Sequence, residues 1–373
     1  MFFGRRKPYF FGIDFGTSLI KAVELTLEDG KPKLFNYGQV DLAQLESGVV
    51  TDGNSYDDEL VLYVRALLDR FQPKSHSVYV AMPAFIGLIS LIEFPEMSED
   101  ELKNAIRLES HKYIPLPLED VTLSWEVVGM HEGVGDEARK MEILLVAALN
   151  KEVNRYRKYV DMAGLKMDFL ELETFSLARS IIGQREGLYL LIDIGSRATN
   201  LILVDNGLVK MSRNLDVGGK EVTYTLHEGL DVTVERAEAL KKSSKNFLSA
   251  PESKLIFPAL EMIANEGKRM LSSYAAKYPE ISCQGVVLSG GTAQMVGLVD
   301  YYTGVFGLPV NIGDPWHRIS YDPSVADDVK KLGTSFSVAL GLALSGIDAL
   351  DNKKNQPFGK KPFSLKELLS KEL

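Results

Sequence analysis

The sequence is poor in cysteine, and it has no long hydrophobic run. The single cysteine among 373 residues, Cys283, excludes an internal disulfide framework and is typical of a reducing compartment. The longest apolar runs, such as Phe85 to Ile92, are far too short to cross a bilayer. Because the basic residues near the start are followed directly by a strand pattern, we expect no secretory signal. These absences predict a cytoplasmic protein.

The sequence also lacks a metal-binding histidine cluster and an excess of positive charge. Its five histidines are scattered without metal-ligand spacing, so we expect each to be a surface or hydrogen-bonded residue. A net charge of −9 argues against nucleic acid as a partner. The hydrophobic content of 45% is ordinary for a globular chain, and the length is sufficient for two or three cores.

Two segments about 180 residues apart carry nearly the same pattern. Gly12-Ile13-Asp14-Phe15-Gly16-Thr17-Ser18 in the first corresponds to Leu191-Ile192-Asp193-Ile194-Gly195-Ser196-Arg197 in the second. An apolar run precedes each aspartate and another follows the glycine and hydroxyl residues. This pattern predicts a strand, a tight turn with one carboxylate, and a returning strand. One copy alone is compatible with an ordinary β-turn, but ordinary turns have no reason to repeat their flanking pattern.

Two such hairpins facing each other are suited to binding a polyanion. Glycines let backbone N–H groups approach phosphate oxygens, and the hydroxyl groups add donors. The carboxylates of Asp14 and Asp193 can hold Mg²⁺ through its waters. We therefore predict a phosphate-binding role for both hairpins.

A third segment, residues 286–297, supports the two hairpins. It contains a buried strand pattern that ends at Gly290-Gly291 and a predicted helix that follows. Such a junction lets a nucleoside or its phosphate lie against bare backbone at a helix N-terminus. The same two glycines are equally compatible with a purely structural role, in which they leave space for close packing of neighbouring segments.

Strand and helix patterns alternate along the chain and predict an α/β architecture. The clearest helix is predicted at 57–71, and a capping box of Ser98 and Glu101 begins another that extends to about Tyr113. The further predicted elements are strands at 77–82, 85–94, 121–128 and 141–148, a helix at 151–163, and a strand and helix within 167–183.

On these motifs the chain resembles the actin-like ATPase superfamily. The resemblance implies an α/β, ribonuclease H-like fold of two lobes, with an inserted α+β subdomain in the first lobe and with ATP and Mg²⁺ as ligands. The implied nucleotide-binding residues are Asp14, Gly16, Thr17, Ser18, Lys21, Asp193, Gly195, Ser196, Thr199, Gly218, Gly219, Glu238, Lys241, Gly290, Gly291, Thr292 and Gly297. Asp14 and Asp193 are the implied Mg²⁺ residues, through water. Residues 237–241 are equally compatible with a solvent-exposed helix whose charged residues are spaced i and i+3.

Within that superfamily the chain resembles the PilM family of type IV pilus assembly proteins. The resemblance is carried by Phe94-Pro95-Glu96-Met97-Ser98-Glu99-Asp100-Glu101-Leu102, by residues 108–117 with Tyr113-Ile114-Pro115, and by residues 144–148, 163–165 and 171–179. It implies an ATP-binding cytoplasmic scaffold at the inner face of the inner membrane, which binds the cytoplasmic N-terminal tail of PilN. That scaffold connects the PilN/PilO complex to the pilus motor. The inserted subdomain and first lobe are implied to form the groove for the tail.

The expected domain organisation follows the same resemblance. The first lobe is predicted at 1–77 and 166–188, the inserted subdomain at 78–165, and the second lobe at 189–350 with a small-residue crossing helix at 334–345. Residues 351–373 are predicted to form a polar linker and a short C-terminal amphipathic helix.

ATP hydrolysis needs a residue that positions the attacking water. The superfamily places this residue just before the second hairpin, where Glu171 and Glu173 are the candidates. Either can equally be a helix-start carboxylate favoured by the helix dipole. We predict tight Mg-ATP binding with slow or negligible turnover.

Two other functions remain open. A filament-forming, membrane-attached protein like FtsA is suggested by the lysine-rich linker and the C-terminal segment, whose Leu365, Leu368 and Leu369 share one helix face. A helix that docks on a protein surface explains the same pattern. A small-molecule kinase is the third function, and no catalytic aspartate for it is recognisable.

Overall fold

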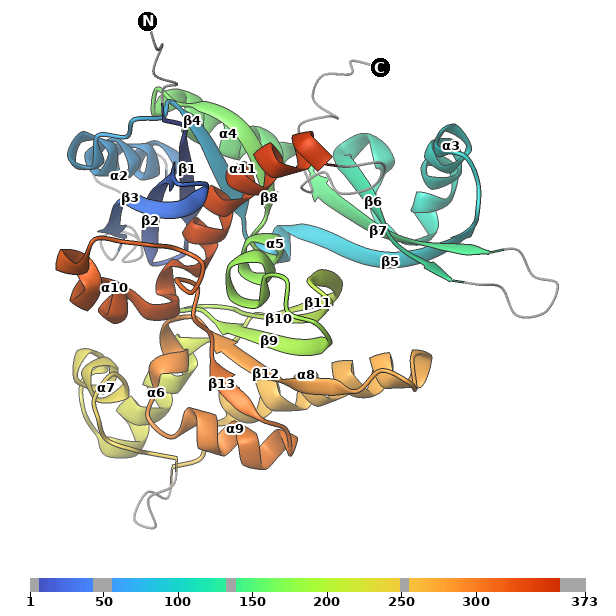
Figure 1. The fold of residues 1–373 in the computed structure, drawn as a ribbon. Helices are drawn as coiled ribbons and strands as arrows, with labels where there is room; N and C mark the ends of the chain where they lie inside the picture. Colours follow the sequence, from blue (N-terminus) through green and yellow to red (C-terminus); the bar gives the residue numbers. More distant parts are fainter. Residues whose placement is uncertain (1–6, 43–55, 132–138, 249–254, 356–373) are drawn as a thin grey trace, which may run out of the picture. The chain divides into compact units, whose positions relative to one another are not determined.

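The computed structural model describes residues 7–42, 56–131, 139–248 and 255–355. The chain divides into two compact units. The first lies within residues 1–176, 319–321 and 342–373, and the second within 177–318 and 322–341. Each unit contains its own five-stranded sheet (Figure 1).

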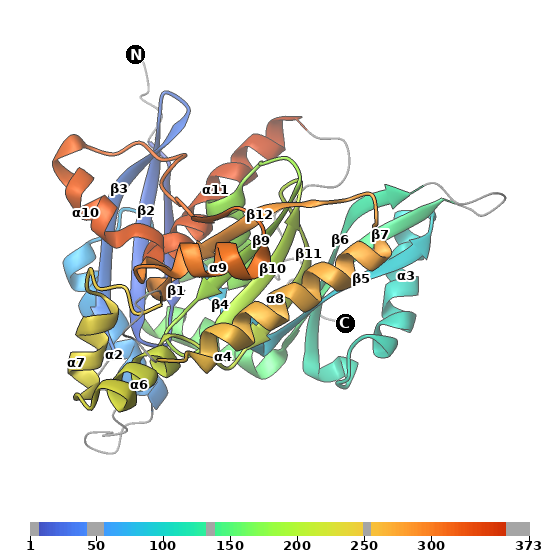
Figure 2. The same ribbon diagram turned by 90° about the horizontal axis from the view of Figure 1, so that it is seen from below.

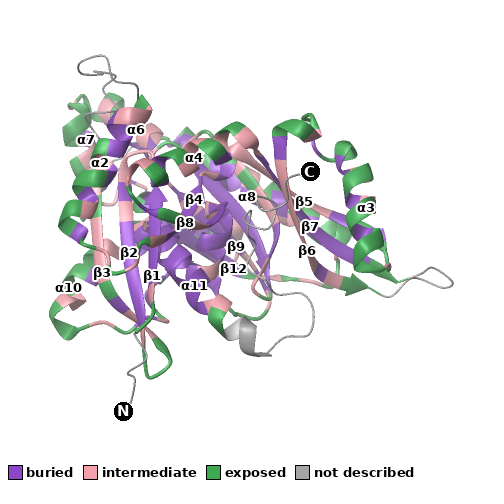
Figure 3. Ribbon diagram, turned by 90° about the horizontal axis from the view of Figure 1, so that it is seen from above, coloured by how far each residue is buried: buried purple, intermediate pink, exposed green. Residues whose placement is uncertain are grey.

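The main sheet of the first unit has the strand order β3-β2-β1-β4-β8. An antiparallel meander is formed by β1 (Tyr9–Phe15), β2 (Leu19–Glu28) and β3 (Lys31–Asp41). Next to β1, β4 (Ser77–Met82) and β8 (Lys166–Leu172) add in parallel. The centre of this sheet is buried, in agreement with the apolar sequences of β1 and β4 (Figure 3). The predicted first hairpin is therefore confirmed as β1 and β2.

Two helices pack near the first sheet. The buried stripe of α2 (Tyr56–Phe71) faces the sheet, and the ring of Phe71 lies 5.1 Å from that of Phe11 on β1. The second helix, α4 (Asn150–Met162), contacts α2 and β8. After β8 follow the short α5 (Glu173–Leu177) and a π-helical turn at Ala178–Ile182, where the sequence predicted a regular helix.

Between β4 and β8 the chain forms a second, three-stranded antiparallel sheet in the order β5-β7-β6. Its strands are β5 (Gly87–Pro95), β6 (Val121–His131) and β7 (Lys140–Leu149). The helix α3 (Glu99–Glu109) covers one face of this sheet through Leu102 and Ile106 (Figure 3). The strands and the helix agree with the expected α+β subdomain, whose boundaries at 78 and 165 remain predictions.

The capping box of Ser98 and Glu101 is confirmed at the start of α3. The helical stretch ends close to the expected residue, Tyr113, but its last turn differs: α3 ends at Glu109 and continues as a 3₁₀ turn, Ser110–Lys112. Pro115 follows soon after, and a proline disfavours helical backbone in the residue before it. Two other 3₁₀ turns flank the small sheet at Ala84–Ile86 and Leu118–Asp120.

The sheet of the second unit repeats the topology of the first. Its order is β11-β10-β9-β12-β13, in which β9 (Leu188–Ile194), β10 (Thr199–Asp205) and β11 (Leu208–Leu215) are antiparallel. Parallel strands β12 (Cys283–Ser289) and β13 (Val310–Ile312) complete it. The repeat seen in the sequence is therefore a repeat of whole sheets, which confirms the second predicted hairpin as β9 and β10.

Helices α6 (Gly219–Leu230), α8 (Pro258–Lys277) and α9 (Leu298–Phe306) pack on this second sheet (Figure 2). Their apolar side chains form one core with β9, β10 and β12. The remaining helices are α7 (Val234–Lys241), α10 (Ala326–Leu332) and α11 (Ser337–Asn355), with 3₁₀ turns at Gly291–Gln294, Pro323–Val325 and Gly333–Phe336.

The end of the chain departs from the sequence-based expectation. The helix α11 continues to Asn355, where a polar linker from residue 351 was expected. The predicted C-terminal helix at 363–373 and most of the predicted glycine-rich turn at 131–136 lie outside the described residues. Within the described ranges, one helical stretch, Pro323–Leu350, is long enough to cross a membrane and contains an 18-residue segment that is apolar enough, with a mean hydropathy of 1.4. Since 72% of its most apolar part is buried inside the protein, we interpret it as a core helix.

Candidate functional site

The first hairpin places a buried carboxylate beside a lysine. Asp14, only 5% exposed, pairs in register with Lys21 across β1 and β2, and Lys21 Nζ lies 3.4 Å from Asp14 Oδ2. Burial raises the pKa of Asp14, and the charge and hydrogen bond of Lys21 act against that rise. The carboxylate of Asp14 is suited to hold a divalent ion through the water molecules of that ion, and the ammonium group of Lys21 is suited to pair with a phosphate oxygen.

The turn of this hairpin needs glycine at one position. A Cβ on Gly16 would lie 2.7 Å from the carbonyl oxygen of Leu19, so no other residue fits without movement of the backbone. Thr17 and Ser18 complete the turn, and the Ser18 carbonyl accepts a hydrogen bond from the Leu42 amide. The predicted donors of the first phosphate motif therefore lie together in one turn.

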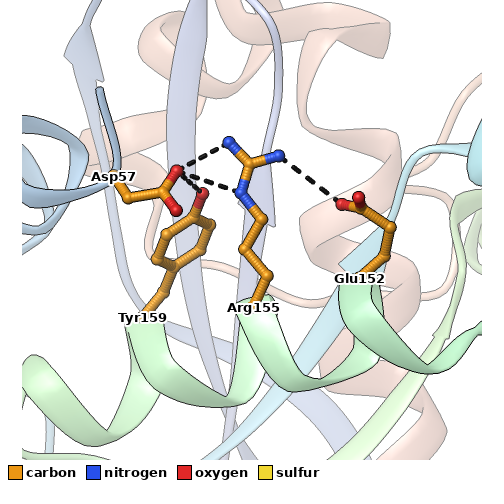
Figure 4. A network of polar contacts seen from close by, with 4 residues as sticks. All are labelled: Asp57, Glu152, Arg155 and Tyr159. Carbon is orange, nitrogen blue, oxygen red and sulfur yellow. Dashed lines mark hydrogen bonds and ion pairs between the residues drawn. The ribbon is translucent and has the colours of Figure 1, made fainter. Parts of the chain in front are cut away.

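Aromatic and charged residues fix the hairpin against α4. The Phe15 ring lies 5.6 Å from the ring of Tyr156 and 5.8 Å from that of Tyr159. Tyr159 and Arg155 both donate to Asp57 Oδ1, at 2.6 Å and at 2.6 and 3.0 Å (Figure 4). Burial alone would raise the pKa of Asp57, but these hydrogen bonds outweigh it and lower the pKa. This network thus connects α2 to α4, the helix against which Phe15 of the first hairpin packs.

The two candidate catalytic carboxylates have different environments. Glu171, at the end of β8, is 2% exposed and accepts a hydrogen bond from the Ser176 hydroxyl at 2.5 Å. Glu173 begins α5 and accepts from the backbone amide of Ala84 at 3.0 Å. Glu171 is therefore not an exposed helix-start carboxylate. Glu173 lies at the start of a helix, and its hydrogen bond connects α5 to the turn after β4.

The second hairpin is tied by its backbone to the start of α6. The amides of Gly219 and Lys220 donate to the carbonyls of Gly195 and Ser196, at 2.8 and 2.9 Å. A Cβ on Gly218 would lie 2.7 and 2.8 Å from these same two carbonyl oxygens. The close approach of α6 to the hairpin turn therefore requires glycine at this position.

A buried polar cluster, formed by Gly219, Thr223, Glu238 and Lys241, joins α6 to α7. Lys241 Nζ donates to the Gly219 carbonyl at 2.9 Å and to Thr223 Oγ1 at 2.8 Å, and it lies 2.7 Å from Glu238 Oε2. Burial lowers the pKa of Lys241, while its hydrogen bond to Glu238 acts in the opposite direction. The solvated-helix interpretation of residues 237–241 is wrong for Lys241, which is only 7% exposed.

The two glycines after β12 differ in the space around them. Gly290 has φ of +85°, and a Cβ there would lie 2.4 Å from the Ile194 carbonyl oxygen at the end of β9. A Cβ on Gly291 would meet no atom within 4 Å. The helix expected after these glycines is a 3₁₀ turn, and α9 begins only at Leu298, after Gly297 with φ of +88°. Glycine is therefore required at position 290 by the close packing against Ile194. At Gly291, in contrast, the space where a Cβ would lie is open.

The remaining predicted residues lie near the same strand ends. Asp193 pairs in register with Asn200 on β10 and Ser289 on β12. Thr199 is buried and donates from its hydroxyl to the Val217 carbonyl, so this side chain supports the loop before α6. Thr292 lies beside Gly219, since its hydroxyl oxygen is 2.4 Å from the position of a Gly219 Cβ.

Over the described ranges no group of three or more histidine, cysteine, aspartate or glutamate residues is arranged to hold a metal directly.

Sequence reasoning missed two hydroxyl residues of the second unit. Thr223 contacts both Lys241 and Glu238, and Thr334 donates to the Gly290 carbonyl at 3.0 Å. Thr223 lies four residues after Gly219, on the same helix face, which is a signal that the sequence contains. For Thr334 the sequence holds no comparable signal, because its partner lies 44 residues away.

The chain is similar to a solved structure of a PilM-PilN type IV pilus biogenesis complex, with 24% identity and a TM-score of 0.74 over 90% of this chain and 98% of that one. The ethanolamine utilization protein EutJ from Carboxydothermus hydrogenoformans is 18% identical, with a TM-score of 0.54 over 90% and 89% of the two chains. At these identities the structures show the fold alone.

Curated relatives are cell division proteins FtsA. The protein from Enterococcus faecalis is 24% identical over 85% of this chain and 81% of its own length. The protein from Neisseria meningitidis serogroup B is 22% identical over 95% and 93%. The model of the family described as type IV pilus assembly protein PilM matches residues 12–347. The chain therefore has the actin-like ATPase fold and belongs to the PilM family of type IV pilus assembly proteins.

Proposed function

We propose that the protein is an ATP-binding scaffold of the type IV pilus assembly machine that binds the cytoplasmic N-terminal tail of PilN. Membership of the PilM family across residues 12–347 carries this proposal. The fold similarity to a chain of a PilM-PilN complex supports PilN as the partner. A scaffold with this partner acts in the cytoplasm at the inner face of the inner membrane, where it links the PilN/PilO complex to the pilus motor.

The residues of each unit fit a nucleotide and a magnesium ion. In the first unit, Asp14 offers a buried carboxylate and Lys21 a cation for phosphate. In the second unit, Asp193 offers the other carboxylate, and the open backbone at Gly291 has space for a flat base. Glu238, with a side chain 37% exposed, is a carboxylate acceptor for ribose hydroxyls. Bound Mg²⁺ would neutralise phosphate charge, and the protein would hold it through water.

The environments of Glu171 and Glu173 favour ATP binding without rapid ATP hydrolysis. Both carboxylates accept hydrogen bonds from protein donors, Ser176 and the Ala84 amide. Glu171 is in addition only 2% exposed, so water has little access to its carboxylate in the ligand-free protein. We expect phosphate release far below the rates of metabolic kinases, measured with purified protein and Mg-ATP. Turnover like that of a metabolic kinase would contradict this part of the proposal.

Peptide binding tests the partner directly. A fluorescent peptide with the N-terminal cytoplasmic sequence of PilN from the same organism is titrated with the full chain in Mg-ATP, and anisotropy is measured. We expect saturable binding, and no binding of a scrambled peptide of equal composition. Equal binding of the two peptides, or binding of neither, would contradict the proposal.

An FtsA-like, membrane-associated and filament-forming function is the second candidate, because the matched curated relatives are FtsA proteins. Liposome flotation with anionic vesicles distinguishes the two. The pilus scaffold is expected to float only when PilN is present in the vesicles. Flotation without PilN that is lost on deletion of residues 362–373 would favour the FtsA-like function.

A further inference from the structure

Several lysines lie at one end of the main sheet of the first unit. Its strands β1, β4 and β8 are parallel, so they begin at the same edge, and the turn between the antiparallel β2 and β3 lies at that edge too. Thr26 pairs in register with both Tyr9 and Lys33. At the start of β8, Lys166 pairs with Ser77, the first residue of β4. We call the lysines of this end of the sheet the basic edge: Lys7, Lys31, Lys33, Lys74 and Lys166.

The basic edge is exposed to solvent, apart from Lys33, whose side chain is 33% exposed. Within the described ranges Lys33 is the one member that forms an ion pair, with Glu28. The pKa of Glu28 is lowered, first by the hydrogen bond from Lys33 and also by the charges of Lys33 and Lys7. The lowered pKa agrees with a positive surface around this turn.

The carboxylates around the basic edge do not cancel its charge. Glu28 and Asp29 lie at the exposed turn, whereas Glu24 and Asp168 lie inside strands. Glu24 is fully buried and accepts hydrogen bonds from two backbone amides of the loop before β4. At the adjoining ends of α2 and α4, two arginines match two aspartates in number: Arg65, Arg70, Asp69 and Asp161. The edge is therefore positive in a chain whose net charge is −9.

Aromatic side chains accompany these lysines. Phe35 on β3 is 42% exposed, and its ring lies edge-on to that of Tyr9, with the centroids 4.8 Å apart. The sequence before Lys7, which lies outside the described residues, continues the same composition with Phe2, Phe3, Arg5 and Arg6. Aromatic rings beside lysines are suited to the boundary between water and lipid, because the rings enter the headgroup region while the ammonium groups stay at the anionic surface.

The arrangement favours a lipid surface over an acidic peptide. The five cations of the basic edge come from four separate segments of the chain, and all are lysines. A lysine ammonium is a hydrated point charge, whereas recognition of a peptide carboxylate typically uses the bidentate guanidinium group of arginine. Lysines spread over strand ends and loops are the pattern expected for electrostatic attraction to anionic lipid.

We propose that the basic edge contacts the anionic surface of a membrane when the tail of PilN holds the chain there, an inference that rests on the proposed function for its tether. The net charge of −9 opposes binding of the free chain to anionic lipid, and a tether overcomes this by raising the local concentration. The contact leaves the nucleotide hairpin open, because Asp14 lies five residues beyond Tyr9, roughly 17 Å along the strand.

The test compares neutral and anionic vesicles that carry the same density of lipid-anchored PilN tail. The vesicles contain phosphatidylcholine alone or phosphatidylcholine with phosphatidylglycerol, and the dissociation constant of the full chain is measured by flotation. In about 0.1 M salt, where the screening length is about 10 Å, we expect about tenfold tighter binding to the anionic vesicles. In about 1 M salt the preference should disappear. Equal binding to the two vesicles at the lower salt concentration overturns the proposal.

A pair of charge reversals locates the contact. We expect Lys31→Glu combined with Lys166→Glu to remove the preference for anionic vesicles and to keep native binding to the neutral ones. The matched control is Lys268→Glu combined with Lys330→Glu, which changes the net charge equally at two exposed positions of the second unit. We expect the control to retain most of the preference. Equal losses in the two pairs would assign the preference to net charge and contradict the proposal.

A second tether separates this proposal from the proposed partner. A native chain that binds no vesicle with the PilN tail would refute PilN as the partner. The chain is therefore also tethered through a C-terminal hexahistidine tag to vesicles with nickel-chelating lipid, neutral or anionic. We expect the same preference of about tenfold for anionic vesicles, and its loss in the Lys31→Glu and Lys166→Glu pair. Equal binding of the native chain to both kinds of nickel vesicle would overturn the membrane contact.

Discussion

Asp14 and Asp193 occupy the same position in two sheets of identical strand order. Each is the penultimate residue of the central strand, and each pairs with an antiparallel neighbour on one side and a parallel neighbour on the other. The paired residues differ, since Asp14 pairs with Lys21 and Asp193 with Asn200. The two copies thus share a carboxylate position, and the register partner of that carboxylate is a lysine in the first copy and an asparagine in the second.

This difference predicts that Lys21 and Asp14 are both essential for ATP. We expect Lys21→Ala and Asp14→Ala to abolish detectable Mg-ATP binding in calorimetry, because they remove the phosphate cation and a metal carboxylate. Lys33→Ala is the matched control, since Lys33 also forms an ion pair with an acidic residue of the same sheet, Glu28. The circular dichroism of all three variants should match that of the native protein. Retained affinity in either site variant would remove that residue from the site.

The buried carboxylate of Asp14 should also cost stability in the absence of ligand. Its native pKa lies above the ordinary value of 3.8, chiefly because of burial, so the folded state favours the protonated form. The contribution of Asp14 to stability is therefore greatest below pH 3.8 and falls as the pH rises through the native pKa. We expect Asp14→Asn to raise the thermal midpoint of the ligand-free protein at neutral pH, because the amide carries no charge that must be buried. A lowered midpoint would contradict this view of the site.

Gly218 is predicted to be required for structure. In Gly218→Ala the new Cβ meets backbone carbonyl oxygens of Gly195 and Ser196, which cannot rotate away as a side chain can. We expect a loss of about 1–3 kcal/mol in the free energy of unfolding by urea, typical of overpacking. Gly304→Ala on α9 is the control, because a Cβ there meets nothing within 4 Å. Similar stabilities of the two variants would show that the turn is free to move.

Gly291 is predicted to be required for the ligand and not for the fold. Since a Cβ at Gly291 meets no protein atom within 4 Å, Gly291→Ala should keep the urea midpoint of the native protein. If a nucleoside lies against this backbone, the added methyl group should weaken ATP binding by about tenfold or more, because steric contact replaces a close approach. Unchanged ATP affinity in calorimetry would place the nucleoside elsewhere.

Local sequence signals predicted both hairpins, the strands β4 to β8, the strand β12 and the capping box, because each depends on residues within a few positions of one another; they did not predict β3, β11 or β13. The same reasoning failed after Gly291, where two glycines with positive φ, Gly290 and Gly297, bracket a 3₁₀ turn. It also gave no sign of the π-helical turn at Ala178–Ile182. Contacts such as Thr334 with Gly290 depend on how distant segments pack, and no local pattern encodes them.

Calorimetric titration of the full chain with Mg-ATP tests the central claim most directly. If the duplicated hairpins are a nucleotide-binding apparatus, the native protein binds one ATP per chain, and removal of Mg²⁺ with a chelator weakens that binding. No heat of binding at millimolar ATP, or binding that is the same in native protein and Asp14→Ala, would contradict the claim.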